Sequence, residues 1–253
     1  MTQFFVGLQR PSTAFAFAFS MLSINVLRNR KRGFFTNKWL LDSGAFTELS
    51  TYGCWRTSPL EYATQIDRLC NNGDLLGTVS QDFTCEPLIL QKTRLTVQDH
   101  QRLTIERYVR LVELTDAYIM PVLQGFSPES YAAHAREYGG LLRQGQWVGV
   151  GSVCKRNGNP RQIEDVLLAI KSERPDLRLH GFGIKLTALR SATVRSLLYS
   201  SDSMAWSFAG RSKRDGSEHD PRLALAYAAK VEPLLNQPLL VQPQLFRQWS
   251  LVQ

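Results

Sequence analysis

Short apolar segments of strand length recur along the chain, and amphipathic segments with helical spacing separate them. The apolar pattern predicts strands at residues 4–8, 20–25, 39–43, 76–83, 118–123, 147–151, 179–184 and 201–206. Helical spacing and capping signals predict helices at residues 59–70, 98–115, from 127 onward, 160–172, near 188–198 and 221–231. Strands that alternate with helices form a parallel sheet, so eight of them predict an α/β protein with a closed (β/α)8 TIM barrel.

One domain accounts for this pattern. The chain has 253 residues, which is enough for a barrel-sized core. We find no internal repeat and no low-complexity linker, so we expect residues 1–253 to form a single domain, with the segment after Gln237 left unassigned. The competing fold is an open doubly wound sheet, which has the same alternation of strands and helices. The glycine-rich turns form neither a GxGxxG nor a GxxxxGK(S/T) phosphate-binding fingerprint.

The excess of basic residues bears on the partner rather than on the fold. The net charge is +8 and the pI is about 9.5. This balance favours an anionic partner such as a nucleic acid, although a basic enzyme without such a partner has the same composition. A basic loop at Arg28–Arg32 is either a solvated face or, beside a nucleic-acid site, a set of phosphate contacts.

The cysteines and the hydropathy argue against several classes of protein. Cys54, Cys70, Cys85 and Cys154 lie far apart with no CxC or CxxC pair. The close-spaced zinc signature is therefore absent, and no disulfide framework is expected. No basic-then-apolar leader and no apolar run of about 18 residues is present. We expect reduced thiols, no bound metal, and a cytoplasmic protein that does not span a membrane.

Polar residues follow several of the predicted strands. Asp42, Asp82, Gln124 and Asp202 stand at strand ends. In a barrel the carboxyl ends of the strands meet at one rim, so we expect these side chains and the backbone of residues 149–152 to meet there. A glutamine donates and accepts at once, as a purine edge requires. Two carboxylates in different environments can divide a reaction between nucleophile and acid or base. A three-carboxylate magnesium site is the chemical alternative.

The segment Trp39–Phe46, with the sequence WLLDSGAF, is the most informative of these strand ends. A short apolar strand ends in Asp42, Ser43 and Gly44. Glycine allows the backbone to approach a flat substrate closely, and Phe46 offers an aromatic surface beside the carboxylate. The alternative is that Asp42 or Ser43 caps a helix that follows.

Five motifs, in consistent order, resemble those of one enzyme superfamily. LDSGAF resembles the DSGGF motif of the tRNA-guanine transglycosylases, SQDFTCEP their second aspartate motif, MPVLQG their VQG motif, and VGVGSV their glycine-rich guanine-facing strand. The fuller pattern QDFTCEP, MPVLQGF, VGVGSVCKRNG, HGFGIK and SSDSMAWSFAGR is closer to the DNA-guanine transglycosylases, which place 7-deazaguanine bases in phage or bacterial DNA. The resemblance covers roughly residues 4–211.

The resemblance implies a TIM barrel and a base exchange through a covalent intermediate. A carboxylate attacks the sugar C1′, guanine leaves, and a 7-deazaguanine such as 7-cyano-7-deazaguanine takes its place. Matched by motif, Asp202 is the nucleophile and Asp42 the acid/base. The implied base-contacting residues are Ser43, Gly44, Phe46, Asp82, Gln124, Gly125, Gly151 and Ser152.

The resemblance also bears on partners. It implies DNA and a deazaguanine base as substrates, partner proteins of a DNA-modification system, and no cofactor. Basic residues near the predicted strand ends are candidate DNA contacts: Lys155, Arg156, Lys185 and Arg211, with Lys213 and Arg214 beside them. His180 lies in an apolar strand and is predicted to be a hydrogen-bonded core histidine rather than a ligand.

Two departures from the superfamily pattern keep alternatives open. The nucleophile motif DxxD reads Asp202-Ser203-Met204-Ala205, so its second carboxylate is an alanine. A non-catalytic nucleic-acid-binding subunit with the same fold, in which Asp202 only braces its strand, is therefore one alternative. The CxC…CxxC…H zinc element of the tRNA enzymes is missing. This argues against tRNA as the substrate, although tRNA base exchange is the second alternative.

Overall fold

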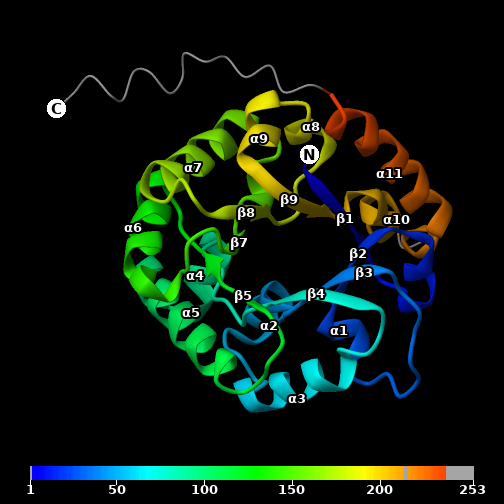
Figure 1. The fold of residues 1–253 in the computed structure, drawn as a ribbon, viewed down its shortest axis with the longest axis horizontal. Coiled ribbons are helices and arrows are strands. Elements are labelled where there is room, and N and C mark those ends of the chain that lie inside the picture. The colour runs from blue at the N-terminus through cyan, green and yellow to red at the C-terminus, as the bar shows by residue number, and fades with distance from the viewer. Residues whose placement is uncertain (1, 214–215, 238–253) are drawn as a thin grey trace.

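The computed structural model describes residues 2–213 and 216–237, and the strands in this part of the chain form one parallel sheet. They are β1 (Gln3–Leu8), β2 (Phe19–Ser23), β3 (Lys38–Asp42), β4 (Asp74–Val79), β5 (Ile119–Met120), β6 (Val122–Leu123), β7 (Trp147–Val150), β8 (Arg178–Gly181) and β9 (Leu198–Ser203). Every hydrogen-bonded pair of strands is parallel. Figure 1 shows the strands as a ring with helices outside it, an α/β architecture compatible with the predicted (β/α)8 barrel.

The two ends of the strand order are neighbours in the chain. The order is β5-β4-β3-β2-β1-β9-β8-β7-β6, and only Pro121 separates β5 from β6. Proline has no N–H to donate to a neighbouring strand, whereas its carbonyl accepts the Gly149 N–H at 2.8 Å. The segment predicted as one strand at 118–123 is therefore two short strands, one paired with β4 and the other with β7. Nine strands are found in the described residues where eight were predicted, and Pro121 accounts for the difference.

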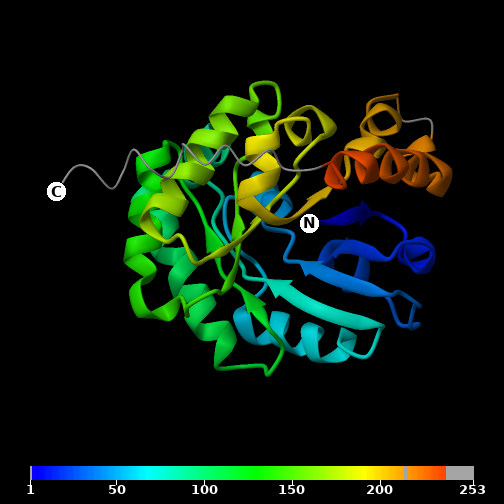
Figure 2. The same cartoon turned by 45° about the horizontal axis from the view of Figure 1, so that its top comes forward.

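Helices cover the outside of this ring, as Figures 1 and 2 show from two directions. They are α1 (Ile24–Leu27), α2 (Ala45–Tyr52), α3 (Pro59–Leu69), α4 (Pro87–Thr93), α5 (Val97–Val112), α6 (Pro128–Tyr138), α7 (Pro160–Glu173), α8 (Leu186–Leu189), α9 (Ala192–Leu197), α10 (Phe208–Lys213) and α11 (Pro221–Leu235). Short 3-10 segments are η1 (Pro11–Ala16), η2 (Gly139–Leu141), η3 (Cys154–Arg156), η4 (Ala205–Ser207) and η5 (Ser217–His219). Capping boxes at Ser58, Thr96 and Ser127 start α3, α5 and α6, because each side chain accepts the N3 backbone N–H.

Helices α2 and α4 follow strand ends where the pattern predicted none, because both are too short to show a periodic pattern. Gly44 is the N-cap of α2 and has a left-handed φ of 77°. No side chain caps this helix, so the alternative that Asp42 or Ser43 serves as its N-cap is wrong. The helix predicted near 188–198 is two short helices, α8 and α9. The strand predicted at 201–206 is β9, which begins and ends three residues earlier in the sequence.

The core has an inner and an outer layer. The inner cluster contains Phe5, Met21, Leu40, Val79, Met120 and Val122 from the strands. Trp39 and Leu41, the neighbours of Leu40, belong instead to the larger cluster between the strands and the helices. Successive side chains of a strand point to opposite faces. The side chains two positions after Leu40 and Val122, which are Asp42 and Gln124, therefore project above the inner apolar layer.

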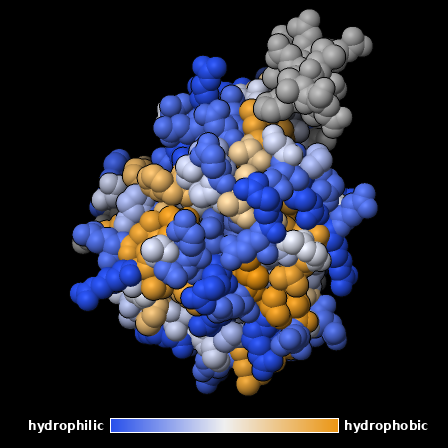
Figure 3. All heavy atoms as spheres, turned by 90° about the vertical axis from the view of Figure 1, so that its left-hand side faces the viewer, coloured by the Kyte–Doolittle hydropathy of each residue, from blue (hydrophilic) through white to orange (hydrophobic). Residues whose placement is uncertain are grey.

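The outer surface of the helical ring is mostly hydrophilic, with separate apolar groups, on the face shown in Figure 3. Among the described residues, no helix combines the length and the apolar character needed to cross a membrane. The unassigned segment after Gln237 lies outside the described residues.

Candidate active site

A cavity of about 260 Å³ lies at the carboxyl ends of the strands. Its walls include these residues from the sequence-based set: Asp42, Gly44, Phe46, Asp82, Gln124, Gly151, Ser152 and Asp202. The structure thus brings the three predicted aspartates and the glutamine together in one place. The volume is at the small end of ligand pockets, which suits one planar base.

Asp42 stands at the end of β3 on the inner face of the ring. Its Oδ2 accepts the Gly44 N–H at 3.2 Å. Burial is the main cause that raises the pKa of Asp42 to about 6, and the charge of Asp202 adds to it, whereas the Ser23 hydroxyl and the Gly44 N–H oppose it. A carboxyl group with this pKa exchanges protons readily near neutral pH.

Asp82 and Gln124 form the opposite part of the wall and are held by a chain of hydrogen bonds. The Cys85 N–H donates to Ser152 Oγ at 2.9 Å, the Ser152 hydroxyl donates to Gln124 Oε1 at 2.7 Å, and Gln124 Nε2 donates to Asp82 Oδ2. Burial raises the pKa of Asp82 to about 7, although the Gln124 amide opposes this shift. These hydrogen bonds fix the amide of Gln124 against Asp82 Oδ2, and no other side chain in the described part of the protein donates to the Asp82 carboxylate.

Gly151 and Ser152 support Gln124 more directly than the resemblance implied. A Cβ on Gly151 would overlap the Gln124 amide, so only glycine fits there. The Gly151 N–H donates to Leu123 O at 2.9 Å, and its carbonyl accepts from Tyr131 at 2.7 Å. The backbone N–H of Gly151 is therefore not available to a base. Ser152 has a left-handed φ of 57°, an unusual conformation for a residue with a side chain.

Asp202 lies on β9, beside the end of β8. Its Oδ1 accepts the Gly183 N–H at 3.0 Å and faces His180 Nε2 at 3.3 Å. No hydrogen bond to Oδ2 is found within the described part of the chain. His180 is fully buried and hydrogen-bonded at both ring nitrogens, so the prediction of a satisfied core histidine is confirmed.

Three residues lie elsewhere than the motifs suggested. Ser43 is fully buried, its hydroxyl has no hydrogen-bond partner among the described residues, and it is not part of the cavity wall. Gly125 also lies outside the wall, where a Cβ would overlap Ser130 and Tyr131 of α6. Ala205, at the second position of the nucleophile motif, belongs to η4 and is not in the wall either. Ser43 and Gly125 therefore support the site from behind rather than lining it.

Several of the basic residues proposed as DNA contacts lie beside aromatic groups near the strand ends. Lys155 Nζ is 5.3 Å from the centre of the Phe46 ring, and Lys185 Nζ is 5.5 Å from that of Phe208. Arg156 donates to the carbonyl of Phe126. Lys213 is exposed, whereas the side chain of Arg211 and the whole of Arg214 lie outside the described residues.

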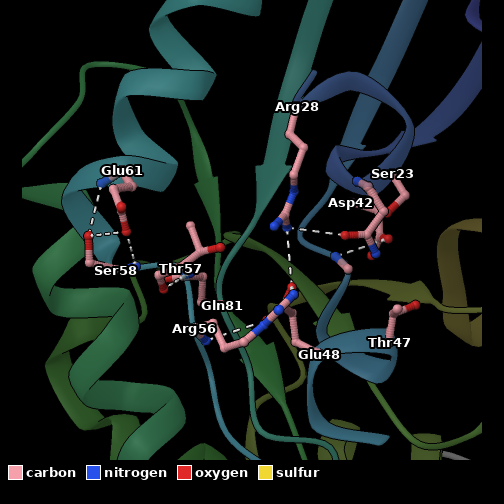
Figure 4. Close-up of polar contacts among 12 residues, drawn as sticks. Ser23, Arg28, Asp42, Thr47, Glu48, Arg56, Thr57, Ser58, Glu61 and Gln81 are labelled. Carbon is pink, nitrogen blue, oxygen red and sulfur yellow. Dashed lines mark hydrogen bonds and ion pairs between the residues drawn. The ribbon is translucent and has the colours of Figure 1, made fainter. Parts of the chain in front are cut away.

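An ion cluster around one buried carboxylate was not predicted from the sequence. Glu48 of α2 is buried, and its carboxylate is 3.4 Å from both Arg28 and Arg56. Figure 4 shows the Arg28 guanidinium above Glu48, with a dashed line joining the two side chains. Arg28 also donates to Asn25 Oδ1 at 3.1 Å. The basic loop at Arg28–Arg32 marked Arg28 as a possible phosphate contact. No local pattern indicated that Glu48 would form ion pairs with two arginines.

Glu86 and Cys154 also line the cavity, and the sequence analysis assigned no role to either of them. Glu86 Oε2 is buried and has no hydrogen-bond partner among the described residues. Burial, and then the charge of Glu86, raise the pKa of the Cys154 thiol. A thiol with a raised pKa is a poor nucleophile, so the surroundings of Cys154 do not activate it for attack.

The residues described by the structure contain no group of three or more His, Cys, Asp or Glu side chains placed to hold a metal ion. The three carboxylates of the cavity therefore do not converge as a magnesium site would require. We expect the purified protein to contain no stoichiometric zinc or magnesium. Elemental analysis checks this, and one zinc per chain would show that residues distant in sequence assemble a site.

A protein-family model described as DpdA, DeoxyPurine in DNA protein A, matches residues 3–223. The matched region contains every residue of the cavity wall. A search of curated proteins gave no match.

Proposed function

Because the chain belongs to the DpdA (DeoxyPurine in DNA protein A) family, we propose that it is a DNA guanine transglycosylase of the tRNA-guanine transglycosylase superfamily. It replaces guanine in DNA by a 7-deazaguanine base such as 7-cyano-7-deazaguanine. The observation that carries this proposal is the meeting of Asp42, Asp82, Gln124 and Asp202 in one base-sized cavity.

The reaction is a double displacement at the sugar. Asp202 Oδ2 attacks C1′, the glycosidic electron pair passes to N9 of guanine, and Asp42 supplies the proton with which guanine leaves. The deazaguanine then enters, Asp42 takes its N9 proton, and N9 attacks C1′ to release the Asp202 carboxylate. Each half-reaction transfers one proton through Asp42, so atoms and charge balance over the cycle.

Asp82 and Gln124 are suited to hold the base edge common to both substrates. Guanine and 7-deazaguanine present the same N–H donors on their six-membered rings and differ at position 7. Asp82 Oδ1 accepts such donors, while Gln124 keeps Oδ2 occupied. The protein therefore holds both bases in the same way and exposes both to the same reacting carboxylates.

The target guanine must leave the helix stack before C1′ reaches Asp202. Extruding a base costs a few kcal/mol in duplex DNA. Cations beside the cavity, such as Lys155, Lys185 and the Glu48-anchored pair Arg28 and Arg56, offset this cost through phosphate contacts. The exposed ring of Phe46 offers a stacking surface at the mouth.

Nucleoside mass analysis tests the function directly. DNA from cells that carry the gene and are supplied with a deazaguanine precursor should contain the modified deoxynucleoside, and cells with Asp202→Ala should not. Modified tRNA in place of modified DNA would favour tRNA base exchange. A wild-type protein that binds DNA but exchanges no base would favour the non-catalytic subunit, the alternative that Ala205 keeps open.

DNA binding should weaken steeply with salt, because each phosphate contact releases counterions. We expect Lys155→Gln and Lys185→Gln each to lower the slope of log K against log salt by about 1. Arg110→Gln is the matched control, because Arg110 lies on the outer helix α5 and is paired with Glu113. Fluorescence anisotropy at several salt concentrations measures the slopes. Equal slopes for all three variants would show that Lys155 and Lys185 do not contact the DNA phosphates.

The two half-reactions should depend on pH in opposite directions about the Asp42 pKa of about 6. Adduct formation needs protonated Asp42, so its rate falls as pH rises above about 6. Attack by the incoming base needs ionised Asp42, so its rate falls as pH drops below about 6. Rapid-quench measurements of each half-reaction from pH 4.5 to 8.5 check this. Parallel profiles would mean that Asp42 is not the group that transfers the proton.

A further inference from the structure

We propose that His180 is a positioning residue for Asp202: it donates a hydrogen bond to Oδ1 and thereby leaves Oδ2 as the attacking oxygen. The inference rests on the proposed function in one respect, namely that Asp202 is the nucleophile. The evidence is a directed chain of hydrogen bonds inside the barrel, which the reaction scheme above does not use.

The hydrogen bonds lead from Trp147 on β7 to Ser200 on β9, then to His180 on β8, and finally to Asp202 on β9. Trp147 Nε1 donates to Ser200 Oγ at 2.7 Å, and Ser200 Oγ is 2.9 Å from His180 Nδ1. His180 Nε2 is 3.3 Å from Asp202 Oδ1. His180 and Ser200 are register partners in the parallel pairing of β8 with β9, and Asp202 is two residues beyond Ser200 on the same face. The strand pairing thus places all three side chains in a row.

The direction of the chain follows from which groups can donate. An indole N–H only donates, so Ser200 Oγ accepts from Trp147. The Ser200 hydroxyl hydrogen is then free for the lone pair of His180 Nδ1, which places the imidazole proton on Nε2. The reverse tautomer would direct an Nε2 lone pair at a carboxylate oxygen and leave the Ser200 hydrogen without an acceptor. Nε2 therefore donates to Asp202.

Packing holds the imidazole in this orientation. His180 is fully buried, and its ring lies 4.8 Å from Phe182, 5.9 Å from Phe5 and 6.0 Å from Trp147, measured between centroids. A side chain fixed on three sides loses little freedom when it donates. Together with the Gly183 N–H, His180 places two donors on Oδ1, and the lone pairs of Oδ2 are left for C1′.

The two donors also act when the intermediate breaks down. In the ester formed with C1′, Oδ1 becomes the carbonyl oxygen, and it regains negative charge as Asp202 departs. Donors already aimed at that oxygen stabilise the charge as it develops. The expected effect of losing the His180 donor is therefore on the chemical steps, and the affinity for the base, which Asp82 and Gln124 hold, should not change.

His180→Phe tests this by removing the donor while keeping an aromatic ring. We expect an exchange rate about 100-fold lower, a loss typical of one oriented donor at a developing charge, with unchanged KM for the base. His180→Gln restores an N–H near Oδ1 and should recover part of the rate. Ser200→Ala should cause a smaller loss by itself and no further loss when added to His180→Phe, because both changes break the same chain.

Stability is separated from positioning by a control in the helix layer. Ile170→Val, in the core side of α7, lowers Tm without touching the cavity and should exchange bases at the wild-type rate. If His180→Phe exchanges at the wild-type rate, or if its loss is additive with that of Ser200→Ala, the inference fails. If the wild type exchanges bases and Asp202→Ala is inactive, that failure leaves the proposed function standing.

A second measurement does not depend on activity. The chain has four histidines, so the His180→Phe variant assigns the His180 signals in a spectrum of the ¹⁵N-histidine-labelled protein. We expect the tautomer with its proton on Nε2 in the wild type and a loss of that fixed state in Ser200→Ala. A wild-type His180 with its proton only on Nδ1 would overturn the inference even if no exchange assay were active.

Discussion

Asp202→Ala is expected to abolish both guanine exchange and the covalent DNA adduct. A nucleophile cannot be replaced by the groups that position it. Loss of an attacking residue commonly lowers turnover by about 10⁴-fold or more. Asp202 is the carboxylate at the end of β9 whose Oδ1 is held by Gly183 and His180, and its second oxygen carries no hydrogen bond among the described residues. Radiolabelled guanine exchange, together with denaturing gels that trap the adduct, measures both losses.

The same experiment distinguishes the alternatives. DNA binding should persist in Asp202→Ala, because the carboxylate does not attract phosphates. Asp165→Ala, which removes an exposed acid from α7, should exchange guanine as the wild type does. Exchange by Asp202→Ala at the wild-type rate would make Asp202 structural and transfer the role of nucleophile to Asp42 or Asp82. Absence of both exchange and adduct in the wild type, with its proper base and DNA, would favour the non-catalytic subunit.

Asp42→Ala should lower turnover by about 10²- to 10⁴-fold, the usual contribution of a general acid or base. Guanine would depart without its proton, and the incoming base would find no acceptor for its own. The physical basis is the burial that raises the pKa of Asp42 to about 6. Asp42→Asn is the conservative variant, because asparagine keeps the size of the side chain and an oxygen that can accept the Gly44 N–H, but it cannot take up or release the proton. Single-turnover rates of each half-reaction measure the effect.

Two further results bear on the Asp42 assignment. In Asp42→Asn the rates of the two half-reactions should no longer change in opposite directions with pH, because the titrating carboxyl group has been replaced by an amide. An adduct should still form slowly, since Asp202 remains. If Asp42→Asn instead lowers base affinity and leaves the single-turnover rates and their pH limbs intact, Asp42 binds the base and another group transfers the proton.

Much of the architecture could be predicted from the sequence because it depends on local pattern. Apolar segments at residues 4–8, 39–43 and 147–151 correspond to β1, β3 and β7, since alternation along a strand is a property of neighbouring residues. The same alternation placed Asp42 and Gln124 at one rim, where the cavity contains them. The motif order that resembled DNA-guanine transglycosylases agrees with the DpdA match over residues 3–223.

Short elements escaped prediction because tertiary contacts rather than periodicity form them. Helix α2 has a glycine N-cap and no side-chain cap, and it is too short for a clear apolar face. Pro121 divides a predicted strand because it cannot donate to its neighbour, although both halves remain in the ring.

The contacts between the site residues depend on how distant parts of the chain pack together. The Ser152–Gln124–Asp82 chain joins residues 28 and 42 positions apart in sequence, and the Glu48 cluster joins a helix to two loops. The pKa values of Asp42 and Asp82 are raised by burial, which no local pattern reports. His180 was predicted to be satisfied, but its partner Asp202 depends on the register of β8 against β9. The sequence determined which residues reach the rim, and strand register and close packing determined which of their atoms meet.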